Sequence, residues 1–217
     1  MHAARVLHSR CADGDFAIDA EPAALRDRRA RFSPGAWTWL RQVHGSEVVV
    51  VREPGASAGA EADAAVTDVP GAVLAVHTAD CVPVLFHDPA SGVIGAAHAG
   101  WRGLAAGVID RTVEAMAGLG GTARLAFVGP HIRGRCYDFG AADLDDVAAR
   151  LGDDVRATTA AGSPALDLTA AVRSVLGRLE VAAEFESGCT ACEPDQFFSH
   201  RARRDRGRHA STITLVP

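Results

Sequence analysis

The chain has 217 residues, of which 48% are hydrophobic and 23% charged, and its formal net charge is −5. This composition is typical of a globular protein, and the length suits a single domain over residues 1–217. The negative charge argues against a nucleic-acid partner, and no apolar run approaches the roughly 18 residues of a membrane span. All 22 basic residues are arginines, which excludes Schiff-base catalysis and a Walker-type phosphate loop because both need a lysine.

The N-terminus, MHAARVLHSR, lacks the apolar core of a signal peptide. The chain has five cysteines in an odd and scattered set: Cys11, Cys81, Cys136, Cys189 and Cys192. A disulfide framework is therefore not expected, and we predict that the protein works in a reducing cytoplasm.

Hydrophobic periodicity, taken in chain order, predicts more strands than helices. The expected strands cover residues 4–9, 47–53, 72–77, 81–87, 92–98, 123–130, 181–186 and 210–217. The expected helices cover residues 21–32, 101–121, 141–152 and 166–179, and the run 53–63 is expected to be a surface loop. Because the strands do not alternate strictly with helices, the predicted class is α+β with a mixed, largely antiparallel sheet.

Two apolar runs around the turn sequence DPAS predict a β-hairpin between residues 81 and 98. With residues 88–91 as the loop, Cys81 would lie opposite His98 and His87 opposite Gly92. Opposed residues of an antiparallel pair lie about 4.5–5.5 Å apart, so this thiol and imidazole could share a metal ion or act as nucleophile and base. A buried cysteine and a satisfied core histidine explain the pair equally well.

His44, Cys81 and His98 each lie in a glycine-flanked or polar turn beside an apolar run. Three mixed nitrogen and sulfur ligands with a fourth position for water are typical of a catalytic zinc site. Asp80 could orient a ligand or act as acid or base, or it could be a turn carboxylate. His77 would face the same cleft, but four strand residues place it about 13 Å from Cys81, beyond coordinating reach.

Three further patterns concern anions and thiols. Arg102, at the start of the helix expected over 101–121, could bind an anion or be a solvated first-turn residue. The tail 200–209 holds five arginines, and a solvated loop is the default interpretation, with phosphate binding as the alternative. The pair Cys189 and Cys192 has no second Cys-x-x-Cys partner, so plain packing is the preferred interpretation over a zinc site.

The motifs RQVHG, TADCVPVLFHD, AAHAGWRGLAAGVI, VGPHIRGRCYDFG, LDL and CT…FFSHR occur in this order. With them the chain resembles the YfiH-like family, whose members are named laccase-domain proteins, polyphenol oxidases, peptidoglycan editing factors and purine nucleoside phosphorylases. The resemblance implies a sandwich-like core flanked by helices, as in the cytotoxic necrotizing factors. It also implies zinc, with copper as the alternative, held by the positions matching His44, Cys81 and His98.

The activity that the resemblance implies is phosphorolysis of adenosine, inosine and methylthioadenosine, with adenosine deamination beside it. The partners are then a purine nucleoside and phosphate. We expect Asp80, Cys81 and Arg102 in the catalytic site. Substrate and phosphate would be held by residues drawn from Arg10, Arg41, Gln42, Arg102 and Arg201.

Two alternatives remain at this point. Related folds among bacterial toxins use a Cys/His pair as a deamidating hydrolase, so Cys81 and His98 could act on an amide without metal. The chain could also be a catalytically weakened cell-wall or division-associated homologue, because HSRCADGDFA replaces the family's glycine-rich turn and asparagine segment while keeping Arg10. The preferred nucleoside and the oligomeric state stay open.

Overall fold

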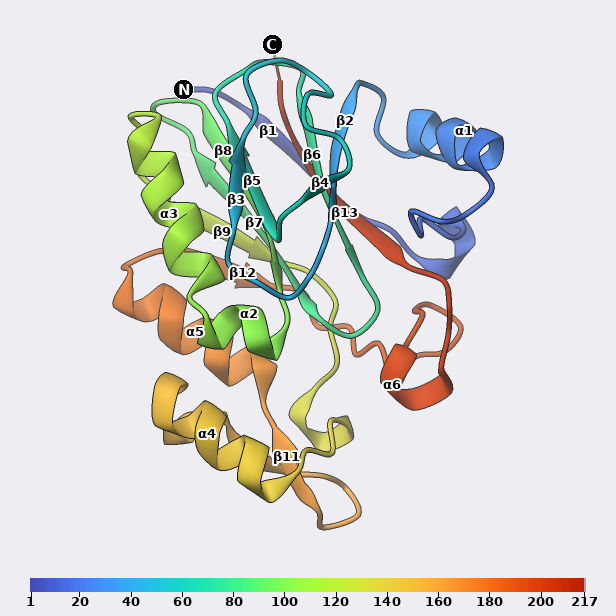
Figure 1. The fold of residues 1–217 in the computed structure, drawn as a ribbon, viewed down its shortest axis with the longest axis vertical. Helices are drawn as coiled ribbons and strands as arrows, with labels where there is room; N and C mark the ends of the chain where they lie inside the picture. Colours follow the sequence, from blue (N-terminus) through green and yellow to red (C-terminus); the bar gives the residue numbers. More distant parts are fainter. Residues whose placement is uncertain (217) are drawn as a thin grey trace.

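The computed structural model of the chain describes residues 1–216 as two stacked β-sheets with helices on both outer sides (Figure 1). The first sheet has six strands in the order β12-β9-β7-β8-β5-β3. Their bounds are Ala182–Phe185, Leu125–Val128, Val82–Asp88, Val93–Ala99, Ala64–Thr67 and Val48–Val50. The second sheet has five strands in the order β1-β13-β6-β2-β4. Their bounds are Ala4–His8, His209–Leu215, Val73–Thr78, Trp37–Arg41 and Ala60–Glu61.

The helices divide between the two outer faces and the rim of the cavity described below. They are α1 (Pro22–Phe32), α2 (Trp101–Ala105), α3 (Val108–Gly118), α4 (Ala141–Leu151), α5 (Leu168–Arg178) and α6 (His200–Arg203). Helices α3 and α5 cover the six-stranded sheet, and α1 lies on the far side of the five-stranded sheet (Figure 1). A small hairpin of β10 (Arg156–Thr158) and β11 (Pro164–Leu166) lies beside α4.

Alternation along the central strands explains the layers. In β7, Val84 and Phe86 belong to the core beneath the helices, whereas Leu85 belongs to the core between the sheets. In β6, Leu74 and Val76 enter that same inter-sheet core. Since successive strand residues point to opposite faces, a strand buried on both sides reads as one continuous apolar run.

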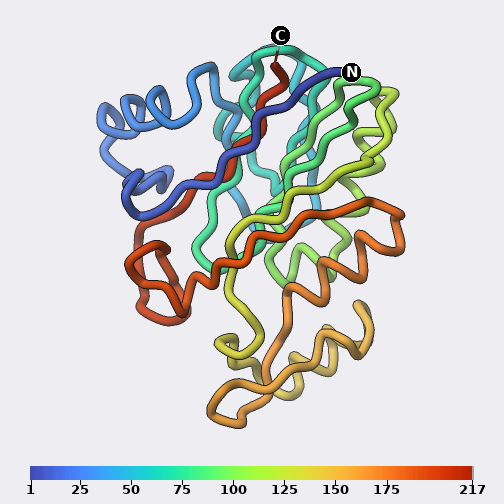
Figure 2. The backbone as a smooth tube through the Cα atoms, turned by 180° about the vertical axis from the view of Figure 1, so that it is seen from behind, coloured from blue at the N-terminus to red at the C-terminus, as the bar shows by residue number. Residues whose placement is uncertain are grey.

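The two ends of the chain form one edge of the five-stranded sheet. Strand β1 pairs antiparallel with β13, from Ala4 opposite Leu215 to His8 opposite Ser211. Figure 2 shows the two strands side by side. Both large sheets mix parallel and antiparallel pairs, and the predicted α+β class with a mixed, largely antiparallel arrangement is confirmed. Among the described residues, no helix is long and apolar enough to cross a membrane.

Most predicted elements are confirmed, and the structure differs from the prediction in the following places. The helix expected over 101–121 is two helices, because Gly107 adopts a left-handed conformation (φ 84°) between α2 and α3. Strands β2, β5, β10 and β11 were not predicted, and β4 lies within the run 53–63 expected to be a loop. Helix α6 was not predicted either, and it lies in the tail 200–209, for which a solvated loop was the default interpretation. The last predicted strand reached Pro217, which lies outside the described residues.

The predicted hairpin register is wrong by two positions. Pro83, rather than Cys81, lies opposite His98, and Asp88 pairs with Val93. The turn starts one residue later than expected because the Asp88 carboxylate accepts hydrogen bonds from Ala90 N–H and the Ser91 hydroxyl. An even shift leaves every side chain on its original face, so Cys81 and His98 stay on one side of the hairpin as diagonal neighbours.

The path between β6 and β7 also differs from the prediction. Residues 77 and 81 do not share one extended run, because the chain turns at Asp80 (φ 95°) and crosses from the five-stranded to the six-stranded sheet. The sharp turn places Cys81 just before β7 begins. The sequence HTADC therefore joins the two sheets.

We expect Gly107→Ala to lower the free energy of unfolding by about 1–2 kcal/mol, because a Cβ disfavours the left-handed conformation. The matched control is Gly118→Ala at the end of α3, where an added Cβ meets no atom within 4 Å. There alanine should stabilise the helix by about 0.5–1 kcal/mol. Urea unfolding of both variants measures the difference, and a neutral Gly107→Ala would contradict the assigned helix break.

Candidate metal centre and arginine-lined cavity

A cavity of about 890 Å³ opens beside the loop that joins the two sheets. Its volume is in the range of sites that enclose a drug-sized ligand. Among the residues named in the sequence analysis, its lining includes Gln42, His44, His77, Asp80, Cys81, His98, Arg102 and Arg201. The structure thus gathers most of the candidate site from separate parts of the chain.

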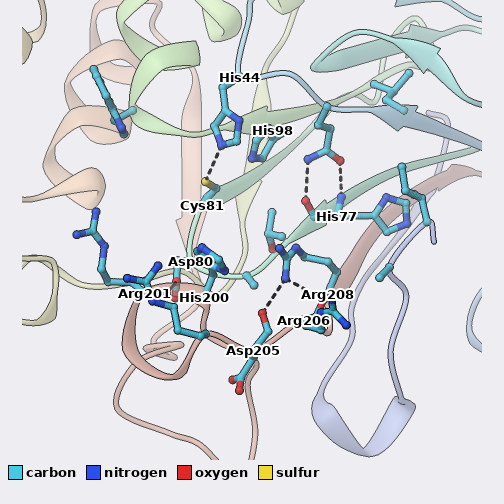
Figure 3. A pocket seen from close by; sticks show the side chains of 18 of the residues that line it. His44, His77, Asp80, Cys81, His98, His200, Arg201, Asp205, Arg206 and Arg208 are labelled. Carbon is cyan, nitrogen blue, oxygen red and sulfur yellow. Dashed lines mark hydrogen bonds between the residues drawn. The ribbon is translucent and has the colours of Figure 1, made fainter. Parts of the chain in front are cut away.

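His44, Cys81 and His98 point toward one another at one end of the cavity (Figure 3). One ligand atom of each residue lies within 4.8 Å of the others. The Cys81 Sγ lies 3.7 Å from His44 Nε2, and the two imidazole rings meet edge to face with centroids 4.8 Å apart. Three side chains from three loops or strands therefore form one compact donor set.

The donor set depends on Asp63, a fully buried carboxylate just before β5. Its Oδ1 lies 2.8 Å from His98 Nδ1. The same carboxylate accepts hydrogen bonds from the backbone N–H groups of Val43, His44 and Gly45 at 2.7–3.1 Å. Because Asp63 holds Nδ1, the Nε2 atom of His98 is left to face Cys81. A carboxylate behind a histidine in this way fixes the orientation of a metal ligand.

The backbone conformation at His44 places this third donor beside Cys81 and His98. His44 has a φ of 60°, in the left-handed region, and the three N–H groups bound by Asp63 hold it there. Gly100 allows the close approach, since a Cβ at that position would lie 2.7 Å from His44 Cδ2 and 3.1 Å from Cys81 Sγ. The glycine of HAGWRG is therefore a steric requirement of the donor set.

The charges of the set are coupled. Burial alone would raise the pKa of Cys81, but the adjacent His98 and the hydrogen bond from His44 lower it to about 6. Burial alone would lower the pKa of His98, but the negative charge of Cys81 and the bond to Asp63 raise it to about 9. Each charge stabilises the other, so without metal the pair favours a thiolate on Cys81 beside an imidazolium on His98.

The donor set fits zinc on its chemistry. Two imidazoles and a thiolate are common zinc ligands, and three protein ligands leave one coordination position open toward the cavity. The 3.7 Å separation of Cys81 Sγ and His44 Nε2 is close to the edge of a tetrahedral site with bonds of about 2.0–2.3 Å. Metal binding would displace the proton of the His98 imidazolium.

Asp80 is a positioning residue in this structure. Its carboxylate accepts hydrogen bonds from the hydroxyls of Thr190 and Ser199 at 2.7 and 2.6 Å, and from the Arg201 N–H at 2.6 Å. All three donors belong to the C-terminal segment that includes α6. The carboxylate next to Cys81 thereby fastens the arginine-bearing segment to the metal-centre loop.

The cavity wall opposite the donor set is basic. The guanidinium of Arg102 lies over the Trp101 ring at 4.3 Å, and that of Arg201 lies over the Tyr137 ring at 4.8 Å. Both side chains line the cavity, together with residues of the tail whose role the sequence left open: His200, Arg204, Arg206 and Arg208. Figure 3 shows this segment below the Cys81 loop. Stacking on an aromatic ring fixes the orientation of each guanidinium group, which lowers the entropy cost of binding an anion.

Two predicted phosphate-binding arginines do not line the cavity. Arg10 pairs with Glu186 and lies over the Phe197 ring at 4.7 Å. Arg41, the last residue of β2, is exposed. Sequence proximity to the active motifs was a poor guide to the direction of these long side chains. Phosphate binding by Arg10 and Arg41 stays a prediction, and the proposal below uses Arg102 and Arg201, which do line the cavity.

Gln42 reaches the cavity, but its amide is engaged. It accepts a hydrogen bond from His77 N–H and donates one to the His77 carbonyl, both at 2.7 Å. The side chain thus extends the pairing of β2 with β6 beyond the end of the strand. The His77 ring lines the cavity outside the donor set, and burial lowers its pKa to about 3.

Sequence reasoning missed Asp63 and Tyr137. Asp63 stands alone before an alanine-rich strand, and its partners lie 18–35 residues away in the chain. Tyr137 belongs to the motif VGPHIRGRCYDFG, which supports the family resemblance but predicts no role for this residue. Neither residue has a local pattern that points to the cavity.

Comparison with known proteins identifies the class to which this fold and donor set belong. Residues 7–216 match the family described as multi-copper polyphenol oxidoreductase laccase, and the chain belongs to this family. It is 41% identical over 211 residues to a purine nucleoside phosphorylase of Mycobacterium tuberculosis, which covers 93% of this chain and 83% of the relative.

Two further relatives carry the name YfiH. The chain is 40% identical over 189 residues to purine nucleoside phosphorylase YfiH of Shigella flexneri, covering 84% of this chain and 75% of the relative. The crystal structure of YfiH from Bacillus licheniformis, called a hypothetical protein, superposes with a TM-score of 0.83 at 26% identity. That match covers 98% of this chain and 92% of the other. The predicted resemblance to the YfiH-like family is confirmed.

We expect Asp63→Asn to lower the free energy of unfolding by roughly 1–3 kcal/mol, because an amide N–H₂ would face buried N–H donors. It should also weaken metal binding about 10–100-fold through loss of His98 orientation. The control is Asp68→Asn, at an exposed position just after β5. Thermal unfolding and metal titration measure both effects, and wild-type metal affinity in Asp63→Asn would contradict the role of this carboxylate.

In metal-free protein, alkylation of Cys81 by iodoacetamide should rise with pH around a midpoint near 6, because the thiolate is the reactive form. Cys11 serves as the internal control, since burial raises its pKa above the ordinary value. Peptide mass spectrometry separates the two sites. Zinc should suppress the reaction of Cys81 and leave that of Cys11 unchanged; a Cys81 midpoint above 8 would rule out the ion pair.

Proposed function

We propose that this chain is a zinc-dependent purine nucleoside phosphorylase acting on adenosine, inosine and methylthioadenosine, with adenosine deaminase activity at the same site. The observation that carries the proposal is the joining of the His44, Cys81 and His98 donor set to a cavity walled by arginines. Relatives at 40–41% identity that are named purine nucleoside phosphorylases support the reaction class. We place the enzyme in the cytoplasm, because the Cys81 thiol must stay reduced.

Phosphate would bind between Arg102 and Arg201, whose guanidinium groups are held on Trp101 and Tyr137. A phosphate oxygen then attacks C1′ of the ribose, and the C1′–N9 bond breaks with its electron pair going to the purine. The leaving purine takes up the proton given up by hydrogen phosphate, so adenosine and inosine yield ribose 1-phosphate and the free base, and methylthioadenosine yields 5-methylthioribose 1-phosphate and adenine. Held in this way, the two arginines offset the charge of the nucleophile and fix its line of attack.

The deaminase reaction replaces the adenine amino group with a water oxygen and releases ammonia. When bound, zinc supplies a Lewis acid that activates water for this attack. His98, oriented by Asp63, would hold the metal together with Cys81 and His44. Both reactions then use one cavity, with phosphate attacking C1′ of the ribose and water attacking the purine carbon that carries the amino group.

A metal-free amide hydrolase is the second candidate, and the closeness of Cys81 and His98, each of which shifts the pKa of the other toward its charged form, favours it. In that reaction Cys81 would be the nucleophile and His98 the proton donor to the leaving amine. It requires a Cys81 that stays reactive in the protein as isolated. A catalytically weakened homologue would keep the metal and show neither reaction.

Replacing any of the three donors by alanine should remove zinc, whereas His77→Ala should retain it. His77 lines the cavity but lies outside the donor set. Metal analysis of the purified variants measures the difference, and His77→Ala is the matched control for loss of a buried histidine. Zinc retained undiminished in His44→Ala, Cys81→Ala and His98→Ala would end the metal assignment.

Arg102→Gln should raise the KM for phosphate about 10–100-fold, the loss expected for one charge-assisted hydrogen bond of roughly 1.5–3 kcal/mol. Its KM for the nucleoside should change much less. Arg111→Gln is the control, because Arg111 is an exposed arginine on α3 that pairs with Glu114 on the same helix. Steady-state phosphorolysis with varied phosphate gives both constants, and an unchanged phosphate KM in Arg102→Gln would refute the assigned role.

A further inference from the structure

A second cluster of thiols lies outside the cavity. Cys136, Cys189 and Cys192 offer three sulfur atoms that all lie within 4.8 Å of one another. The sequence had indicated plain packing for Cys189 and Cys192, because the third thiol comes from a segment more than 50 residues earlier. Only the fold reveals that the three converge.

The backbone presents these thiols rigidly. The Cys189 carbonyl accepts hydrogen bonds from the N–H groups of Cys192 and Glu193, at 3.1 and 3.2 Å, so both cysteines of CTAC lie on one tight turn. The Cys189 N–H in turn donates to the Glu193 carboxylate at 2.8 Å. Cys136 ends a short 3-10 helix, Gly134–Cys136, that is closed by a Cys136 N–H bond to the Arg133 carbonyl.

Cys136 Sγ and Cys192 Sγ lie 3.0 Å apart, and the Arg135 guanidinium lies 3.5 Å from Cys192 Sγ. Burial alone would raise the pKa of Cys192, but the bonds from Cys136, Cys189 and Arg135 lower it. The cationic Arg135 guanidinium therefore lies beside the cluster, where it would offset the negative charge of metal-bound thiolates. Cys189 is 1% exposed, whereas Cys192 is exposed, so one side of the cluster opens to solvent.

We propose that Cys136, Cys189 and Cys192 form a second metal site, which holds a thiophilic ion such as zinc through three thiolates. The fourth coordination position faces solvent. Three thiolates and a divalent ion carry one net negative charge, which Arg135 balances. A disulfide between Cys136 and Cys192 would use two of the thiols, and it would leave the convergence of the buried Cys189 unexplained. A thiophilic ion engages all three.

The site would stabilise two walls of the cavity at once. Tyr137, which follows Cys136, lies beneath the Arg201 guanidinium. Thr190, which follows Cys189, donates its hydroxyl to Asp80. A metal ion that ties the two segments together would hold Tyr137 and Thr190 in place, so its role is structural and does not depend on the proposed reaction.

The test counts metal in full-length protein purified and reconstituted with zinc under reducing conditions. Wild type should bind two zinc ions. Cys136→Ser, Cys192→Ser and Cys81→Ser should each bind one, whereas Cys11→Ser should still bind two. Cys11 is the matched control, because its N–H bonds Gln196 near the cluster while its thiol lies outside it. Cys192 is exposed, so its substitution leaves the core intact.

Cobalt in the Cys81→Ser background supplies a second measurement. Its thiolate charge-transfer absorption should come from the cluster alone and should be lost on adding Cys136→Ser or Cys192→Ser. Cobalt absorption that persists in these double variants would overturn the proposal. So would a Cys136–Cys192 disulfide whose reduced form binds no zinc. Failure of the proposed phosphorylase would appear instead in the nucleoside assay, with the zinc count unchanged.

Discussion

The candidate site depends on the buried carboxylate of Asp63. One side chain fixes the His44 loop through three backbone N–H groups and orients His98 through Nδ1. A carboxylate taken fully out of water needs such donors, because an unpaired buried charge would be very costly. Asp63 therefore contributes both to the packing of the loop between β2 and β3 and to the geometry of the donor set. Loss of the carboxylate would affect both.

Asp80 performs the corresponding task on the other side of Cys81. It binds the hydroxyls of Thr190 and Ser199 and the Arg201 N–H, so the C-terminal arginines reach the cavity as a fixed wall. Two buried carboxylates thus position two parts of the cavity, the His44, Cys81 and His98 donors and the arginine-bearing C-terminal segment. The proposed phosphorolysis needs the arginines in a fixed position, since its rate depends on the alignment of nucleophile and leaving group.

Much of the fold could be predicted from the sequence, because strands such as β7 are continuous apolar runs. The helix break at Gly107 and the weak alanine-rich strand β5 could not, since their conformations depend on tertiary packing. The motifs around His44, Cys81 and His98 brought the three candidate donors to attention. Asp63 and the third thiol at Cys136 escaped, because their partners are distant in the chain. The directions of the Arg10 and Arg41 side chains could not be predicted either. Arg10 turns toward Glu186, which is distant in the chain, and Arg41 is exposed to solvent.

The central claim is that phosphate held by the arginine wall, and not water, is the nucleophile at the ribose. The most direct measurement is product analysis of adenosine and phosphate incubated with zinc-loaded protein in ¹⁸O-labelled water. Adenine and ribose 1-phosphate should form in equal amounts, with no label on the ribose carbon C1′. Free ribose carrying ¹⁸O, or no release of adenine, would contradict the account.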